Sequence, residues 1–167
     1  SDNYRVSFTD HADHQEAVPS GERATHLVDW YGSVEQALRD VAAWAEDGVP
    51  APASTQYTIE DSQIVISDKE QKRDGLQPSV EITSGGGQVV NAKVGQAVPL
   101  VATVRTPQGA GPVVAAEWDF EADGLYVPRD AVTPSKNATV LVKHVFTAPG
   151  TYFVSVSGAG GSYALNA

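Results

Sequence analysis

Two short segments of the chain carry most of the side chains that could do chemistry. The first, within residues 9–14, holds Asp10, His11, Asp13 and His14. Two imidazoles and two carboxylates so close together could share a metal ion, although their spacing fits no standard zinc motif. A loop does not fix the directions of its side chains, so two exposed loop histidines are the open alternative.

The second segment, residues 119–124, reads DFEADG and could form a calcium site. Asp119, Glu121 and Asp123 stand at positions 1, 3 and 5 of a calcium loop, glycine follows at position 6, and Asp130 falls at position 12. Three carboxylates on one turn repel each other unless a hard cation neutralises them. The alternative is a solvated acidic turn whose aspartates cap backbone amides.

Alternating residues predict that strands flank this acidic turn. Trp118 and Phe120 would lie on one face of a strand, with Asp119 on the other. Further along, side chains alternate on both sides of a predicted Pro149-Gly150 turn, which indicates an antiparallel strand–turn–strand with a positive φ at Gly150. The alternating residues are Val140, Val142, His144, Phe146, Tyr152, Val154 and Val156. We expect one core to collect Trp118, Phe120, Phe146, Tyr152 and Val154.

The residues of these blocks resemble the PKD domain, a β-sandwich module of secreted and cell-surface proteins. The family pattern runs roughly WDFGDG and then H-x-(Y/F)-x-x-PGTY-x-V-x-V, against WDFEADG and HVFTAPGTYFVSV in this chain. The resemblance covers about the last 90 residues, and the acidic turn is one residue longer than in the family pattern. It implies an all-β PKD/Ig-like sandwich over residues 77–167. It also implies an accessory role, with a protein or carbohydrate surface as the partner.

Residues 1–76 have a different pattern. Residues 4–8 alternate like a short strand, and a helix is predicted from about residue 25 to residue 47, with Gly48 and Pro50 ending it. Residues 56–67 predict a hairpin that turns at 60–62, and the charged residues 68–75 are expected to be exposed. The helix should bury one apolar stripe, made of Leu27, Trp30, Tyr31, Val34, Leu38 and Val41.

This order of strand, histidine-bearing loop and long helix resembles the C-terminal end of bacterial secreted α/β-hydrolase-like proteins. The resemblance implies that residues 1–76 are the tail of a larger α/β domain and contact the rest of the parent polypeptide, a serine hydrolase. His11 or His14 would then occupy the general-base position of a Ser-His-Asp triad. The chain has no Gly-x-Ser-x-Gly nucleophile elbow, so we expect no catalysis by this chain alone.

Composition and charge exclude several kinds of partner and of site. Eleven basic residues against 21 acidic ones give a formal net charge of −10, which argues against a nucleic-acid or anionic-membrane partner. There is no cysteine, so disulfides and thiolate metal sites are excluded, and no apolar run approaches the length of a membrane span. The absence of methionine, even at position 1, indicates a processed product or a fragment of a longer chain.

The sequence as a whole therefore predicts an α+β chain of two units. Residues 1–76 form a strand–helix segment of an α/β domain, and residues 77–167 form the sandwich. We expect the protein to be secreted, extracellular or periplasmic. The alternative function is a non-enzymatic cell-surface or adhesion-type interaction module.

Overall fold

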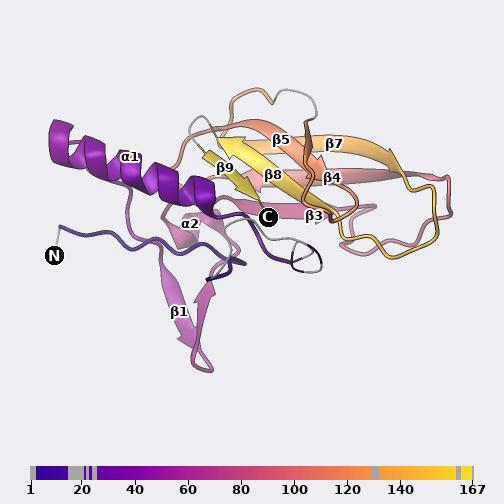
Figure 1. Ribbon diagram of the computed structural model, residues 1–167, viewed down its shortest axis with the longest axis horizontal. Coiled ribbons are helices and arrows are strands. Elements are labelled where there is room, and N and C mark those ends of the chain that lie inside the picture. Colours follow the sequence, from indigo (N-terminus) through magenta and orange to yellow (C-terminus); the bar gives the residue numbers. More distant parts are fainter. Residues whose placement is uncertain are drawn as a thin grey trace.

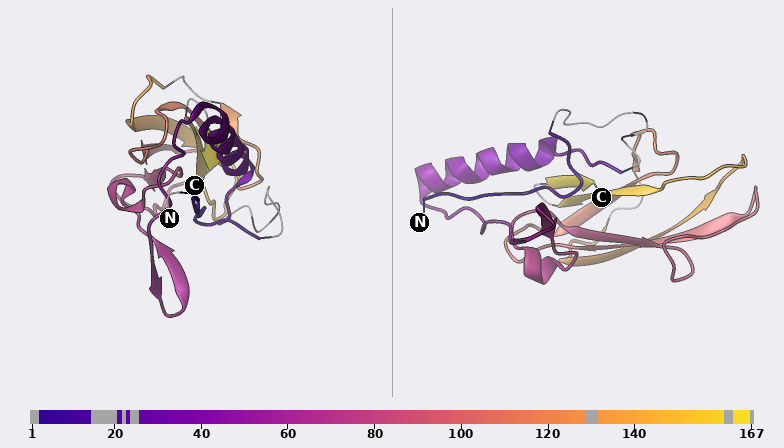
Figure 2. Two further views of the ribbon diagram at one scale, coloured as in Figure 1. Left: turned by 90° about the vertical axis from the view of Figure 1, so that its left-hand side faces the viewer. Right: turned by 90° about the horizontal axis from the view of Figure 1, so that it is seen from below.

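The computed structural model describes residues 3–14, 21, 23, 26–128, 132–160 and 163–166. The C-terminal part is a sandwich of two β-sheets, and the N-terminal part places a long helix and a projecting hairpin at one end of that sandwich (Figure 1). Seen from two further directions, the N-terminal segment runs alongside the helix (Figure 2). Within the described residues, no helix is long and apolar enough to cross a membrane.

The sandwich consists of two antiparallel sheets. One sheet has the strand order β3-β4-β7, from β3 (Ser79–Thr83), β4 (Ala97–Arg105) and β7 (Asn137–Val145). The other has the order β6-β5-β8-β9, from β5 (Val113–Asp119), β6 (Val127–Pro128), β8 (Ser155–Gly160) and β9 (Tyr163–Asn166). The all-β architecture predicted for the C-terminal half is confirmed.

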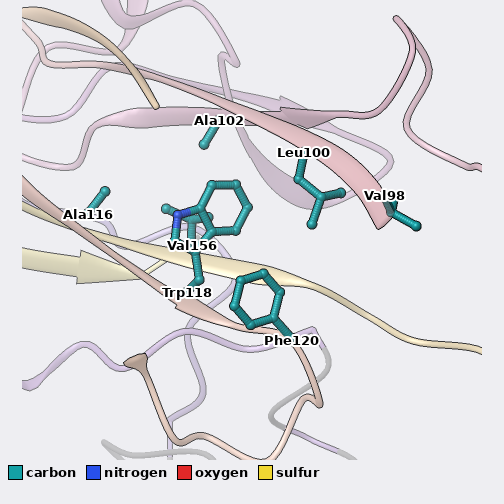
Figure 3. Packing of buried hydrophobic residues seen from close by; sticks show 7 residues of the cluster. All are labelled: Val98, Leu100, Ala102, Ala116, Trp118, Phe120 and Val156. Atoms are coloured by element: carbon teal, nitrogen blue, oxygen red, sulfur yellow. The ribbon is translucent and has the colours of Figure 1, made fainter. Parts of the chain in front are cut away.

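The core lies between the two sheets. Alternate residues of β4 point inward and meet side chains from β5 and β8, as Figure 3 shows for the seven buried residues Val98, Leu100, Ala102, Ala116, Trp118, Phe120 and Val156. Trp118 is fully buried at the centre, and Phe146 and Val154 pack against the cluster from its edge. Four of the five predicted core residues therefore belong to this core, and Tyr152 joins it through a ring contact with Phe146 at 4.2 Å.

The predicted strand–turn–strand around Pro149-Gly150 is wrong in its pairing. β7 pairs with β4, whereas β8 pairs with β5 in the opposite sheet, so the segment between them crosses from one sheet to the other. Alternation along a strand says which face is buried and does not say which strand is its neighbour. The positive φ expected at Gly150 is also absent, and a Cβ there would meet the Tyr152 ring at an ordinary 3.5 Å.

The long helix α1 (Tyr31–Asp47) ends where the sequence predicts and begins later. Gly48 adopts a φ of 68° and donates its N–H to the Ala43 carbonyl, a left-handed C-cap that favours glycine. At the other end Asp29 accepts the N–H of Tyr31 at 2.7 Å, and the N–H of Val28 is bonded to the His11 carbonyl at 2.8 Å. That bond ties residue 28 to the preceding loop, so the described residues 26–30 lie outside the helix.

Two expectations for the N-terminal part are wrong. Residues 4–8 do not form a strand. The Val6 carbonyl accepts the backbone N–H of Thr55 at 2.9 Å, but the N–H groups of Val6 and Phe8 are donated to the side chains of Ser54 and Thr55, so no ladder of backbone bonds forms. The predicted stripe on α1 is not buried, since Leu38 is 66% exposed. The exposed stripe members are Tyr31, Val34, Leu38 and Val41.

The predicted hairpin is confirmed, as β1 (Tyr57–Glu60) paired with β2 (Gln63–Ile66). Its two turn residues, Asp61 and Ser62, have φ values of 49° and 65°, as a two-residue hairpin turn of this kind requires. The hairpin projects away from the sandwich (Figure 1).

The segment after the hairpin is exposed only in part, since Asp68, Lys69 and Lys72 are exposed as predicted and the residues that follow are not. It forms the short helix α2 (Glu70–Arg73), and Arg73 is buried together with Leu76. The division into units at 1–76 and 77–167 stays a prediction, as does the assignment of the first unit to a larger α/β domain.

Candidate functional site

The acidic turn after β5 is organised by one buried carboxylate. Asp119 is 1% exposed and accepts three backbone N–H groups, from Glu121 at 3.1 Å, Asp123 at 3.4 Å and Gly124 at 2.8 Å. The turn can close around this carboxylate because Ala122 and Gly124 both take positive φ values, 55° and 79°. Asp119 therefore caps backbone amides, as in the alternative to a calcium site, although its carboxylate is buried and not solvated.

The other carboxylates of the turn do not gather around Asp119 as ligands. Asp123 accepts the N–H of Leu125 at 2.9 Å, and Glu121 extends toward the His144 ring, 3.9 Å from its Nε2. Asp130 lies outside the described residues. Within the described residues no three His, Asp or Glu side chains lie close enough to hold a metal ion. The calcium site, which needs Asp130, stays a prediction.

A row of stacked rings connects this turn to the opposite sheet. Trp118 stacks on Phe120 at 5.8 Å, Phe120 stacks on His144 at 4.0 Å, and His144 meets Phe146 edge-on at 4.6 Å. Tyr152 ends the row and donates its hydroxyl to the Ala148 carbonyl at 3.0 Å. His144 thus lies between two aromatic rings, where its role is to pack the two sheets together.

A tyrosine on the far side of the acidic turn is held by a polar contact. The hydroxyl of Tyr126 lies 3.3 Å from the Ser155 hydroxyl on β8. Burial raises the pKa of Tyr126 above its usual value, and the nearby negative charge of Asp119 adds to that effect. This side chain stays neutral at ordinary pH and fastens the turn to the second sheet.

The two loop histidines lie at the surface and do not converge with the neighbouring carboxylates on a metal site. His11 is exposed with its Nδ1 3.4 Å from the Asp10 carboxylate, whereas Asp13 forms an ion pair with Arg23. His14 is also exposed. The general-base role that the hydrolase resemblance implies for His11 or His14 stays a prediction.

Sequence reasoning missed the buried guanidinium of Arg73. Its Nε donates to the Ser67 carbonyl at 2.8 Å, and its Nη1 donates to the carbonyls of Gln77 at 3.4 Å and Pro78 at 2.9 Å. Burial lowers the pKa of Arg73, and the carboxylate of Asp10, 3.8 Å away, acts in the opposite direction.

The side chain of Gln77 completes this junction by bonding both the N–H and the carbonyl of Asp10. Arg73 and Gln77 therefore join the N-terminal loop, the end of the hairpin and the entry to β3. The sequence carried no signal for this role, because an arginine in a charged run ordinarily lies in solvent.

A comparison with protein families supports the C-terminal assignment. The sequence profile of the PKD domain matches residues 82–166, about half of the chain. Neither the curated proteins nor the solved structures include a match to this chain.

Proposed function

The chain belongs to the PKD domain family, and on that premise we propose that it is the C-terminal accessory region of a secreted α/β-hydrolase-like protein. The sandwich binds a protein or carbohydrate surface, or spaces the parent protein from it. The protein acts outside the cell or in the periplasm. Catalysis depends on residues outside this chain.

One observation supports the accessory role: the side chains of the family motif make packing contacts and hydrogen bonds within the fold. Trp118 is fully buried, Asp119 accepts three backbone N–H groups, and His144 stacks on Phe120 and meets Phe146 edge-on. A catalytic group needs access to substrate and a partner that activates it. These motif residues support a scaffold and not a reactive site.

The hydrolase part of the proposal is supported by residue order and by the exposed position of His11. A carboxylate beside it, Asp10, is the kind of group that orients a general base. The parent protein would have to supply both the nucleophile and the oxyanion hole, because the chain has no nucleophile elbow.

Hydrolysis of p-nitrophenyl acetate by the purified chain tests whether catalysis needs residues outside this chain. We expect no turnover above background, with the His11→Ala and His14→Ala variants giving the same rate. Turnover that is lost in either variant would show that this chain is itself catalytic.

The accessory role is tested by cosedimentation of the chain with insoluble polysaccharides and with immobilised protein. Retention on one of these surfaces would support binding. If the chain is retained on none of these surfaces, the spacer role remains. A spacer predicts that the parent protein hydrolyses a soluble ester at the same rate when residues 77–167 are removed.

A further inference from the structure

The outward side of α1 carries an apolar surface that the described chain leaves uncovered. Tyr31, Val34, Leu38 and Val41, called here the α1 stripe, are exposed by 58%, 45%, 66% and 57%. Their spacing of three and four residues places them along one side of the helix. Single apolar residues on a surface are ordinary, whereas a continuous stripe marks an interaction site.

A pocket of about 570 Å³ adjoins the α1 stripe, between α1 and the N-terminal segment. The helix contributes Asp40, Val41 and Trp44, and the facing wall includes Tyr4 and Arg5. Val41 belongs to both the stripe and the pocket, so the two form one surface. The volume lies within the range of pockets that enclose a small ligand or a large side chain.

The carboxylate of Asp40, which lines this pocket together with the polar residues Asn3, Arg5 and Ser7, lacks one hydrogen-bond donor. Oδ1 of Asp40 accepts from Gln36 at 2.9 Å, while its buried Oδ2 has no hydrogen-bond partner within the part of the chain that the structure describes. A buried carboxylate oxygen without a donor costs free energy. Because Asp40 lines the pocket, a cationic group that displaces the cover over Oδ2 would supply that donor.

The charge of the surrounding region also favours a cation. Residues 1–76 contain 15 acidic and six basic side chains, a net charge of −9, whereas residues 77–167 contain six and five, a net charge of −1. Nearly all of the negative charge therefore lies on the part of the chain that carries the α1 stripe and the pocket. Such a field attracts basic partners and repels a second copy of the chain.

The aromatic wall of the pocket argues against a sugar as the occupant. The guanidinium of Arg5 lies over the Trp44 ring at 4.5 Å and donates to the Ala51 carbonyl at 3.3 Å. That face of the indole is covered, so Trp44 does not offer it as a stacking platform. The position of the Arg5 side chain shows that this aromatic wall accepts a guanidinium.

We propose that the α1 stripe and the adjoining pocket bind a protein segment in which lysine or arginine residues are interspersed with apolar ones. The apolar side chains cover the α1 stripe. The aliphatic stem of one basic residue lies against the pocket's apolar walls, and its charged head reaches Asp40. This surface is separate from the sandwich, so the inference does not depend on the binding or spacer role proposed for the sandwich.

Fluorescence anisotropy with the full chain and two labelled helical peptides tests the inference. One peptide is built from leucine and lysine at helical spacing, and the other has glutamate in place of every lysine. We expect the lysine peptide to bind at least tenfold more tightly. Leu38→Glu should weaken that binding tenfold or more, and Asp40→Asn several-fold.

Leu141→Glu is the matched control, because Leu141 is a similarly exposed leucine, 63% exposed, that lies on the sandwich. It should bind the lysine peptide as the unchanged protein does. Circular dichroism should show that Leu38→Glu folds normally, since the side chain it replaces lies in solvent.

Three results would overturn the inference. The first is equal binding of the two peptides, and the second is binding of the lysine peptide that neither α1 variant weakens. The third is self-association in sedimentation velocity that Leu38→Glu abolishes, which would assign the α1 stripe to a second copy of the chain.

Discussion

Replacing Asp119 with alanine removes the acceptor around which the acidic turn is built. The carboxylate of Asp119 receives two short bonds, from Gly124 at 2.8 Å and Glu121 at 3.1 Å, and a longer one from Asp123 at 3.4 Å. A hydrogen bond to a charged group contributes about 1.5–3 kcal/mol, and the two shorter bonds dominate. Water can reach part of the turn, so we expect the lower value for each bond, a loss of about 3 kcal/mol.

Two further variants separate this effect from a general loss of charge. Asp119→Asn keeps the shape of the side chain and one carbonyl oxygen, so it should lose about half as much stability. Asp123→Ala also removes a carboxylate from the turn, but it breaks only the bond to the exposed N–H of Leu125. The expected loss there is below about 1 kcal/mol.

Urea unfolding followed by tryptophan fluorescence measures these differences. With a slope of about 1–3 kcal/mol per molar, a 3 kcal/mol loss moves the midpoint by roughly 1–3 M. The reasoning is refuted if Asp119→Ala unfolds at the same urea concentration as Asp123→Ala.

Three other predictions concern the junction around Arg73, the half-buried Tyr126 and the acidic turn. Arg73→Met leaves buried carbonyls without their donor and should lower the free energy of unfolding by about 3 kcal/mol; an unchanged urea midpoint would contradict this. Burial raises the pKa of folded Tyr126, so the unfolded state ionises first and stability falls as pH rises above about 10. Tyr126→Phe should make that fall shallower in urea titrations from pH 9 to 11, and an identical fall would refute the assignment. If calcium binds the acidic turn, it should raise the melting temperature and Asp123→Ala should abolish the rise; equal melting in calcium and EDTA would leave only the capped turn.

The sequence predicted the C-terminal core well because alternation reports burial directly. Trp118, Phe120 and Phe146 all pack where their register places them. The neighbour of each strand could not be read in the same way, since apolar residues alternate along β7 and in the segment that leads into β8, and the two strands still lie in different sheets. Strand pairing depends on where the intervening chain goes, which local periodicity does not encode.

The N-terminal part was harder to predict because its features depend on contacts distant in sequence. Leu38 lies on a good apolar stripe, yet the helix contacts the rest of the chain through a different side, where Trp44 meets Arg5. Arg73 contacts the nearby carbonyls of Ser67 and Pro78, but it also lies 3.8 Å from the carboxylate of Asp10, near the other end of this part of the chain. The burial of Asp119 was not predicted either, because it depends on how the turn that follows folds back over the carboxylate.

The most direct test of the account is the proximity of the Phe120 and His144 rings, whose centroids lie 4.0 Å apart across the two sheets. If the family motif builds the fold and not a reactive site, nuclear Overhauser effects between the ring protons of Phe120, His144 and Phe146 should be strong. Absence of those effects, with the His144 ring in free exchange with solvent, would contradict the claim that the motif residues hold the two sheets together.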